Sequence, residues 1–178
     1  AQDSSITSQF VHKIPKTADY VTDRRSVRWC PQGSNVYSSQ GVKMLRFSMA
    51  NDGWVDPVTC QLHVTVVNDS HVSGDTQTRV HMVNGAWCFF KRLRILCGGV
   101  LVEDLSSWSR LYHMLLQFAP QGYRDNLAIM AGQKGSEVTN NAKFSMPILC
   151  GLLQQTKCLP LRYINLTIEA EIFDSISN

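Results

Sequence analysis

Residues 93–118 read LRILCGGVLVEDLSSWSRLYHMLLQF, and this stretch decides the fold. Gly98 and Gly99 separate two apolar runs, and a two-residue turn of this kind needs positive φ angles, which glycine adopts freely. The stretch therefore predicts a β hairpin. After the hairpin, apolar residues recur at helical spacing, which predicts an amphipathic helix over about residues 105–119. These residues are Leu105, Trp108, Leu111, Tyr112, Leu115 and Phe118.

The ends of this helix carry recognisable start and stop signals. Asp104 or Ser106 is expected to cap its amino terminus, with Glu103 near the positive end of the helix dipole. Pro120 together with Gly122 is expected to end the helix. Adjacent side chains at a strand-to-helix junction diverge, so Glu103 and Asp104 form a poor general acid/base pair.

Strand signals dominate the rest of the chain. Residues 59–67 and 163–173 alternate apolar and polar side chains, a pattern typical of half-buried antiparallel strands. Further strands are expected at 42–49, 78–83, 87–97, 100–102 and 143–150, and at most a short helical turn at 124–130. Strands and helices do not alternate, which disfavours a parallel sheet. The predicted fold class is all-β: an antiparallel eight-stranded jelly-roll sandwich with one inserted helix.

The chain of 178 residues has the length of one domain. Residues 1–34 lack periodicity and are expected to form an extended amino-terminal arm, and residues 35–178 a single jelly-roll domain. The first nine residues are polar, and no apolar run approaches the ~18 residues of a membrane span, so neither a signal peptide nor a transmembrane helix is expected. The chain begins with Ala1 instead of Met, which indicates processing, trimming or excision from something longer.

The charge pattern does not favour a dedicated nucleic-acid reader. The net charge is +3, and charged residues make up 17% of the chain, below the ~25% of an average soluble domain. Such a surface suits a protein that hides much of itself against its own copies. The basic residues form only two small groups, and the tryptophans are scattered, so we expect solvated or interface charges and packing aromatics. The groups are Lys91, Arg92, Arg94 and Arg24, Arg25, Arg28; the tryptophans are Trp29, Trp54, Trp87 and Trp108.

The cysteine spacing excludes two common kinds of site. No C-x-x-C pair is present, which argues against a zinc ribbon and a thioredoxin-like centre. An even number of cysteines is compatible with disulfides, but several lie at apolar strand positions, where a free thiol acts as a small hydrophobe. We therefore expect reduced thiols and assembly inside a cell. The cysteines are Cys30, Cys60, Cys88, Cys97, Cys150 and Cys158.

No motif in the sequence indicates catalysis, so we expect no enzyme, no catalytic residue, no metal and no cofactor. The histidines, His12, His63, His71, His81 and His113, show none of the spacings of a zinc site. Cupins share the jelly-roll topology, but His63 and His81 do not supply their cluster of histidines with a carboxylate. There is no G-x-S-x-G elbow, and Gly132 to Gly135 is too short for a phosphate loop.

Four segments of the sequence carry a resemblance to a known family: 27–37, 54–64, 93–112 and 151–161. In this order they resemble the major capsid proteins of the double jelly-roll lineage, which includes polintons, adintoviruses, virophages and the large nucleocytoplasmic DNA viruses. The third segment is the most specific, because its hairpin, acidic pair and aromatic helix are all similar to the family. The family's chains carry two jelly rolls, whereas this one has the length of about one. It resembles the amino-terminal roll more than a separate single-roll protein.

The resemblance implies a structural protein that forms trimeric, pseudo-hexagonal capsomers, which tile an icosahedral shell. The expected partners are other copies of the chain, neighbouring capsomers, and other capsid proteins such as a penton protein or a second jelly roll. At most a weak contact of the arm with the genome or an inner membrane is expected, and no small-molecule substrate. The expected location is the virion, assembled inside the host cell.

Two alternatives remain open at this point. A jelly-roll lectin or receptor-binding spike would use the loops 68–77 and 132–143 for recognition, and would show saturable binding of a glycan or receptor. A cupin-like enzyme would contain a stoichiometric metal ion.

Overall fold

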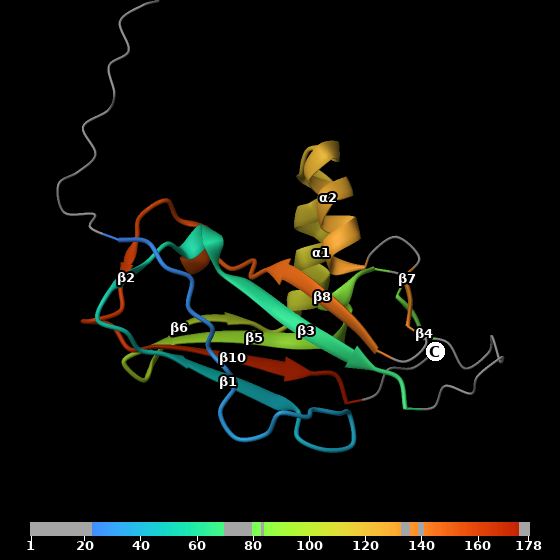
Figure 1. Ribbon diagram of the computed structural model, residues 1–178, viewed down its shortest axis with the longest axis horizontal. Coiled ribbons are helices and arrows are strands. Elements are labelled where there is room, and N and C mark those ends of the chain that lie inside the picture. The colour runs from blue at the N-terminus through green and yellow to red at the C-terminus, as the bar shows by residue number, and fades with distance from the viewer. Residues whose placement is uncertain (1–22, 70–79, 83, 133–135, 139–140, 175–178) are drawn as a thin grey trace, which may run out of the picture.

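The computed structural model describes residues 23–69, 80–82, 84–132, 136–138 and 141–174. Figure 1 shows a β body from which two helices project. The described residues contain ten strands, eight of which have three residues or more. In chain order the elements are β1 (Met44–Met49), β2 (Trp54–Val55), β3 (Gln61–Val67), β4 (Val80–Met82), β5 (Phe90–Cys97), β6 (Val100–Leu105), α1 (Trp108–Phe118), α2 (Gln121–Ala131), β7 (Ser136–Val138), β8 (Asn141–Pro147), β9 (Leu159–Pro160) and β10 (Leu166–Ile172).

The largest sheet has four antiparallel strands in the order β1-β10-β5-β6. β10 lies between β1 and β5, so that Ile168 is opposite both Phe47 and Ile95. Leu166, Ile168 and Ala170 are buried because alternate residues of a strand face the same side. The predicted alternation is thereby confirmed. The strand begins at Leu166 and not at residue 163, because residues 161–163 form a turn.

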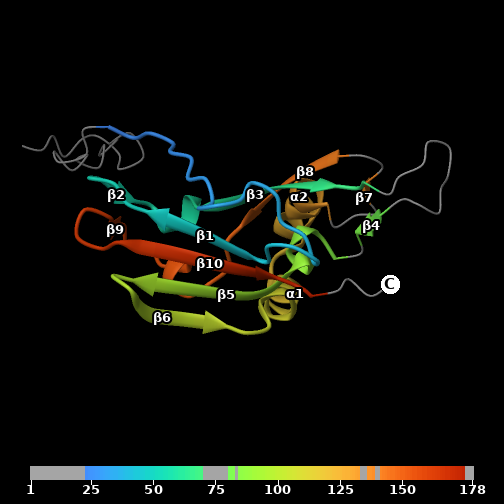
Figure 2. The same ribbon diagram turned by 90° about the horizontal axis from the view of Figure 1, so that it is seen from below.

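A second layer of strands covers one side of this sheet. β3 pairs with β8 in antiparallel register, with Leu62 opposite Met146 and Val64 opposite Phe144. β4 pairs with β7 over three residues of each strand, and β2 pairs with β9 over two. Apolar side chains of β3 and β8 belong to the same buried cluster as those of the four-stranded sheet, so the core lies between the two layers (Figure 2). The protein is mostly β with antiparallel sheets, as predicted for a jelly roll.

Two helices, and not one, follow the hairpin. α1 confirms the predicted helix, although it begins at Trp108 because β6 continues to Leu105. α2 is a full second helix of 11 residues where the sequence predicted at most a short turn. Pro120 ends α1 as expected, but it also lies at the N-cap of α2, and Gly122 falls inside α2 instead of closing α1. Proline at a helix start is favourable because its φ is already helical.

The hairpin at the centre of the sequence is confirmed. Gly98 and Gly99 have φ angles of 58° and 84°, as a two-residue turn requires. Residues 87–89 were expected to begin the first strand of this hairpin. They belong instead to a 3-10 turn at Ala86–Phe89, in which Trp87 is buried. β5 begins at Phe90, after this turn.

The segment before β1 runs along the β body without regular structure. Residues 23–43 contain neither helix nor strand, and the Gln32 backbone N–H donates to the Arg46 carbonyl of β1 at 2.7 Å. Trp29 and Tyr37 pack, partly buried, against the core. The division into an arm at 1–34 and a domain at 35–178 stays a prediction, and residues 1–22 lie outside the described part. No helix among the described residues is long and apolar enough to cross a membrane.

Candidate functional site

The inner face of α1 is fixed to the end of β8 by two aromatic side chains. The buried Trp108 donates from Nε1 to the Leu149 carbonyl at 2.7 Å. Tyr112 donates from its hydroxyl to the Pro147 carbonyl at 3.1 Å, and its ring stacks on Trp87 with the ring centroids 4.5 Å apart. Burial raises the pKa of the Tyr112 hydroxyl, which keeps it a hydrogen-bond donor. These contacts fix α1 to the end of β8 and the residues that follow it.

Glu103 connects the hairpin to a loop far away in the sequence. Its carboxylate accepts hydrogen bonds from the backbone N–H groups of Gly151 at 2.8 Å and Leu152 at 3.1 Å. These are the first residues of a 3-10 turn at Leu152–Gln154 and its N-cap, so the carboxylate satisfies N–H groups that the turn leaves open. The expectation that Glu103 lies at the start of α1 is wrong, because it belongs to β6.

Asp104 does not cap α1 either. The N-cap residue is Ser107, and its side chain makes no capping hydrogen bond. Ser106, the other expected cap, is therefore not the N-cap either. Asp104 pairs instead with the guanidinium of Arg92 on β5. The hydrogen bond from Arg92 lowers the pKa of the Asp104 carboxyl. The two neighbouring acids thus serve two different partners.

The basic group on β5 is paired with acids. Arg94 lies 3.2 Å from the carboxylate of Glu169, which is only 4% exposed and also contacts Arg46. Lys91 reaches Asp174 at 3.4 Å. The pairs of Glu169 connect neighbouring strands of the four-stranded sheet. The expectation of solvated or interface charge stays a prediction.

The outer faces of α1 and α2 expose large apolar side chains, which we call the helix-pair surface. Only three residues of α1 are buried, although its apolar stripe contains more. Phe118 is 84% exposed and Ile129 is 79% exposed. Several large apolar side chains exposed on the same two helices are more typical of an interaction surface than of single scattered surface hydrophobics. The members are Met114, Leu115 and Phe118 of α1, and Tyr123, Ile129 and Met130 of α2.

A second apolar surface lies at the edge of the four-stranded sheet. Within the described residues β6 pairs with β5 alone, and Val100, Leu101 and Val102 are each more than half exposed. An edge strand with consecutive exposed apolar residues is a typical place for contact with another chain. The apolar run itself is visible in the sequence, where Val100, Leu101 and Val102 directly follow the predicted Gly98-Gly99 turn.

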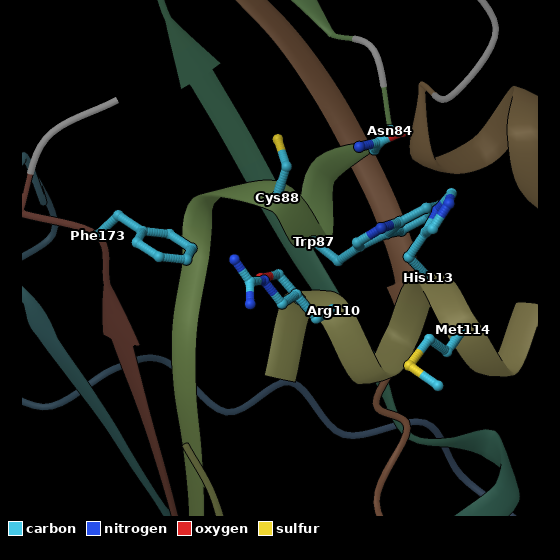
Figure 3. Close-up of a pocket in the computed structure, with 8 residues that line it drawn as sticks. Asn84, Trp87, Cys88, Arg110, His113, Met114 and Phe173 are labelled. Carbon is cyan, nitrogen blue, oxygen red and sulfur yellow. The ribbon is translucent and has the colours of Figure 1, made fainter. Parts of the chain in front are cut away.

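A hollow of about 390 Å³ lies between the base of α1, the 3-10 turn before β5 and the end of β10 (Figure 3). Its walls combine apolar and polar side chains: Asn84, Trp87, Cys88, Ser109, Arg110, His113, Met114 and Phe173. The sequence pointed to none of these as a binding group, because they come from three segments that only the fold brings together.

The histidines are not gathered in the described part of the chain. His63 is exposed on β3, and His113 lies on α1. His12, His71 and the side chain of His81 lie outside the described residues, as do most of the loops 68–77 and 132–143. Within the described residues no group of three histidine, cysteine or acidic side chains could hold a metal ion. The expected lack of a metal, a cofactor and a catalytic site stays a prediction.

All six cysteines are free thiols in the structure. Cys30 and Cys158 are exposed, whereas Cys150 is buried. Burial raises the pKa of the Cys150 thiol to about 12, which leaves almost no thiolate at neutral pH. Cys150 therefore acts as a core residue and not as a nucleophile.

Solved structures with the same fold come from viral capsids. The crystal structure of PBCV-1 VP54, fitted into a cryo-EM reconstruction of the virophage Sputnik, matches with a TM-score of 0.59 at 14% sequence identity. A quasi-atomic model of the PBCV-1 virus capsid matches with a TM-score of 0.58, also at 14% identity. Each match covers 86% of this chain and 37% of the other, so the chain spans little more than a third of these structures' length.

These matches establish the fold. VP54 is a double jelly-roll major capsid protein, so the resemblance inferred from the sequence is confirmed at the level of the fold. No protein-family model matches the sequence, and no curated protein matches it.

Proposed function

We propose that this chain is a structural subunit of a viral capsid, located in the virion, that acts by associating with further capsid subunits. The observation that carries the proposal is the likeness of its fold to capsid structures over 86% of its length. In finer terms, it is the amino-terminal roll of a double jelly-roll subunit, and three such subunits form a pseudo-hexagonal capsomer of an icosahedral shell assembled inside the host cell.

The exposed apolar residues support association. The helix-pair surface and the β6 edge expose large apolar side chains to water, and covering this apolar area in a complex favours association. Two layers of β-sheet make a rigid body, and the loops between strands can vary without disturbing the core. The partners in this proposal are copies of the chain, neighbouring capsomers, a second jelly roll and a penton protein.

Other parts of the proposal concern what the chain does not do. It is not an enzyme and takes no substrate in its assembly role, and the arm makes at most weak contact with the genome or an inner membrane. The paired state of Arg92, Arg94 and Lys91 supports only the lack of a nucleic-acid surface on β5, because such a surface needs cations that are free to meet phosphates. The lectin or spike alternative depends on loops that lie mostly outside the described residues.

Sedimentation velocity of the full natural protein tests the proposal. We expect trimers and larger species for the wild type. The variant Phe118→Ser/Ile129→Ser should weaken association about a hundredfold or more, because both side chains are exposed in the isolated chain and would be covered in the assembly.

The matched control is Val36→Ser. Val36 is 77% exposed but belongs to neither helix and lies in the segment before β1, so association should be unchanged. Circular dichroism should report the same fold for all variants. A wild type that stays monomeric at every concentration would contradict the proposed function. If Phe118→Ser/Ile129→Ser and Val36→Ser change association equally, the helix-pair surface is not part of the subunit interface.

A further inference from the structure

We infer that the hollow at the base of α1 is a binding site for a carboxylate attached to an apolar group. The inference does not depend on the capsid role. It rests on the size of the hollow, on its apolar walls and on the charge of the arginine that lines it.

The size fits a small organic ligand. The volume of about 390 Å³ lies within the ~300–1,000 Å³ typical of small-molecule sites. Trp87, Met114 and Phe173 supply apolar walls from three different segments, and Figure 3 shows Phe173 facing the hollow from the side opposite His113. A bare inorganic ion would leave most of these walls in contact with water.

The charge of the walls selects an anion. Among the described residues that line the hollow, Arg110 is the cation and none is a carboxylate. In the described part of the chain Arg110 has no ion pair, whereas the nearby Asp174 is held by Lys43 at 2.7 Å and by Lys91 at 3.4 Å. A guanidinium fork fits a carboxylate with two parallel hydrogen bonds. Asn84 and Ser109 add neutral donors at the rim.

Trp87 reports on the hollow without bonding to its ligand. It lines the hollow but is only 1% exposed, and its Nε1 and the Nδ1 of His113 are enclosed, with no hydrogen-bond partner among the described residues. Trp108 donates its indole N–H to the Leu149 carbonyl and does not line the hollow. A ligand in the hollow therefore changes the surroundings of the Trp87 indole and leaves those of Trp108 unchanged.

Nuclear magnetic resonance of the full chain tests this directly. The four tryptophan side chains give four indole N–H signals, and Trp87→Phe identifies the one from Trp87. The probes are 3-phenylpropionate, its neutral amide, and the peptide acetyl-Gly-Gly-Phe with either a free or an amidated carboxyl terminus. Comparing the two acids distinguishes a free small acid from the end of a peptide.

We expect the free acids to move the Trp87 signal saturably and to leave the Trp108 signal in place. Arg110→Gln should weaken binding about tenfold or more, because it removes a charged hydrogen-bond partner from an exposed position without disturbing the core. The matched control Arg162→Gln, at an exposed arginine outside the hollow, should bind like the wild type.

Two results would overturn the inference. One is that acid and amide move the Trp87 signal equally, which would mean that the carboxylate is not recognised. The other is that Arg110→Gln binds the acids as tightly as Arg162→Gln does. If only the peptide acid binds, the ligand is a chain terminus; if only phenylpropionate binds, it is a small organic acid; both support the carboxylate site.

Discussion

At the scale of single residues, Gly132 shows how one backbone position joins the helices to the β body. It closes α2 in the left-handed conformation, with φ at 74°, and its N–H donates to the Ala128 carbonyl. A Cβ at this position would overlap the ring of Phe144, which lies on β8 opposite Val64. Both the φ angle and the close approach to Phe144 therefore require glycine.

Gly132→Ala should lower the free energy of unfolding by about 2–4 kcal/mol, through left-handed strain and overpacking. Gly122→Ala is the matched control, because Gly122 lies inside α2 with open space around it. That change should stabilise the protein by about 0.5–1 kcal/mol. Urea denaturation followed by circular dichroism measures both. Equal effects of the two substitutions would refute this role of Gly132.

At the scale of elements, the most informative connection is the one between β6 and the turn at Leu152–Gln154. Glu103 reaches across 48 residues to the backbone N–H groups of Gly151 and Leu152. With the bonds from Trp108 and Tyr112, it fixes the segment that follows β8. The hairpin, α1 and this segment therefore form one packed unit.

Glu103→Gln should lower the free energy of unfolding by about 1–2 kcal/mol, because a neutral amide cannot replace a carboxylate that accepts two backbone hydrogen bonds. Glu171→Gln is the control: its carboxylate lies 3.7 Å from Lys91 at the surface of the sheet, and its loss should change stability by no more than about 0.5 kcal/mol. Thermal unfolding in the same buffer compares them. If Glu103→Gln melts with the wild type, the connection has no energetic role.

The sequence predicted the elements better than their partners. The alternation in β3 and β10 and the pair Gly98-Gly99 act locally, so the strands and the hairpin were correctly predicted. The roles of Glu103 and Asp104 were wrong, because their partners Gly151 and Arg92 are set by tertiary contacts that helix-capping rules do not contain. The hollow near Arg110 was missed for the same reason. The second helix was missed because residues 121–131 bury only Leu127, Ala128 and Ala131, which gives a weak periodic pattern.

At the scale of the whole molecule, the chain combines a closed core with open apolar surfaces. Trp87, Trp108 and Tyr112 are fully buried, yet Phe118, on the same helix as the last two, is 84% exposed. One edge of the main sheet, β1, receives a hydrogen bond from residue 32, whereas β6 exposes a run of apolar residues. The proposed capsid role accounts for this contrast, because these surfaces become buried when subunits meet.

The most direct test of the account is a cryo-EM reconstruction of the particles that form when the full natural protein is expressed. We predict closed shells in which each subunit contains the sheet β1-β10-β5-β6, with the helix-pair surface covered by a neighbouring subunit. Dispersed monomers would contradict the account, and so would shells in which Phe118 and Ile129 face solvent.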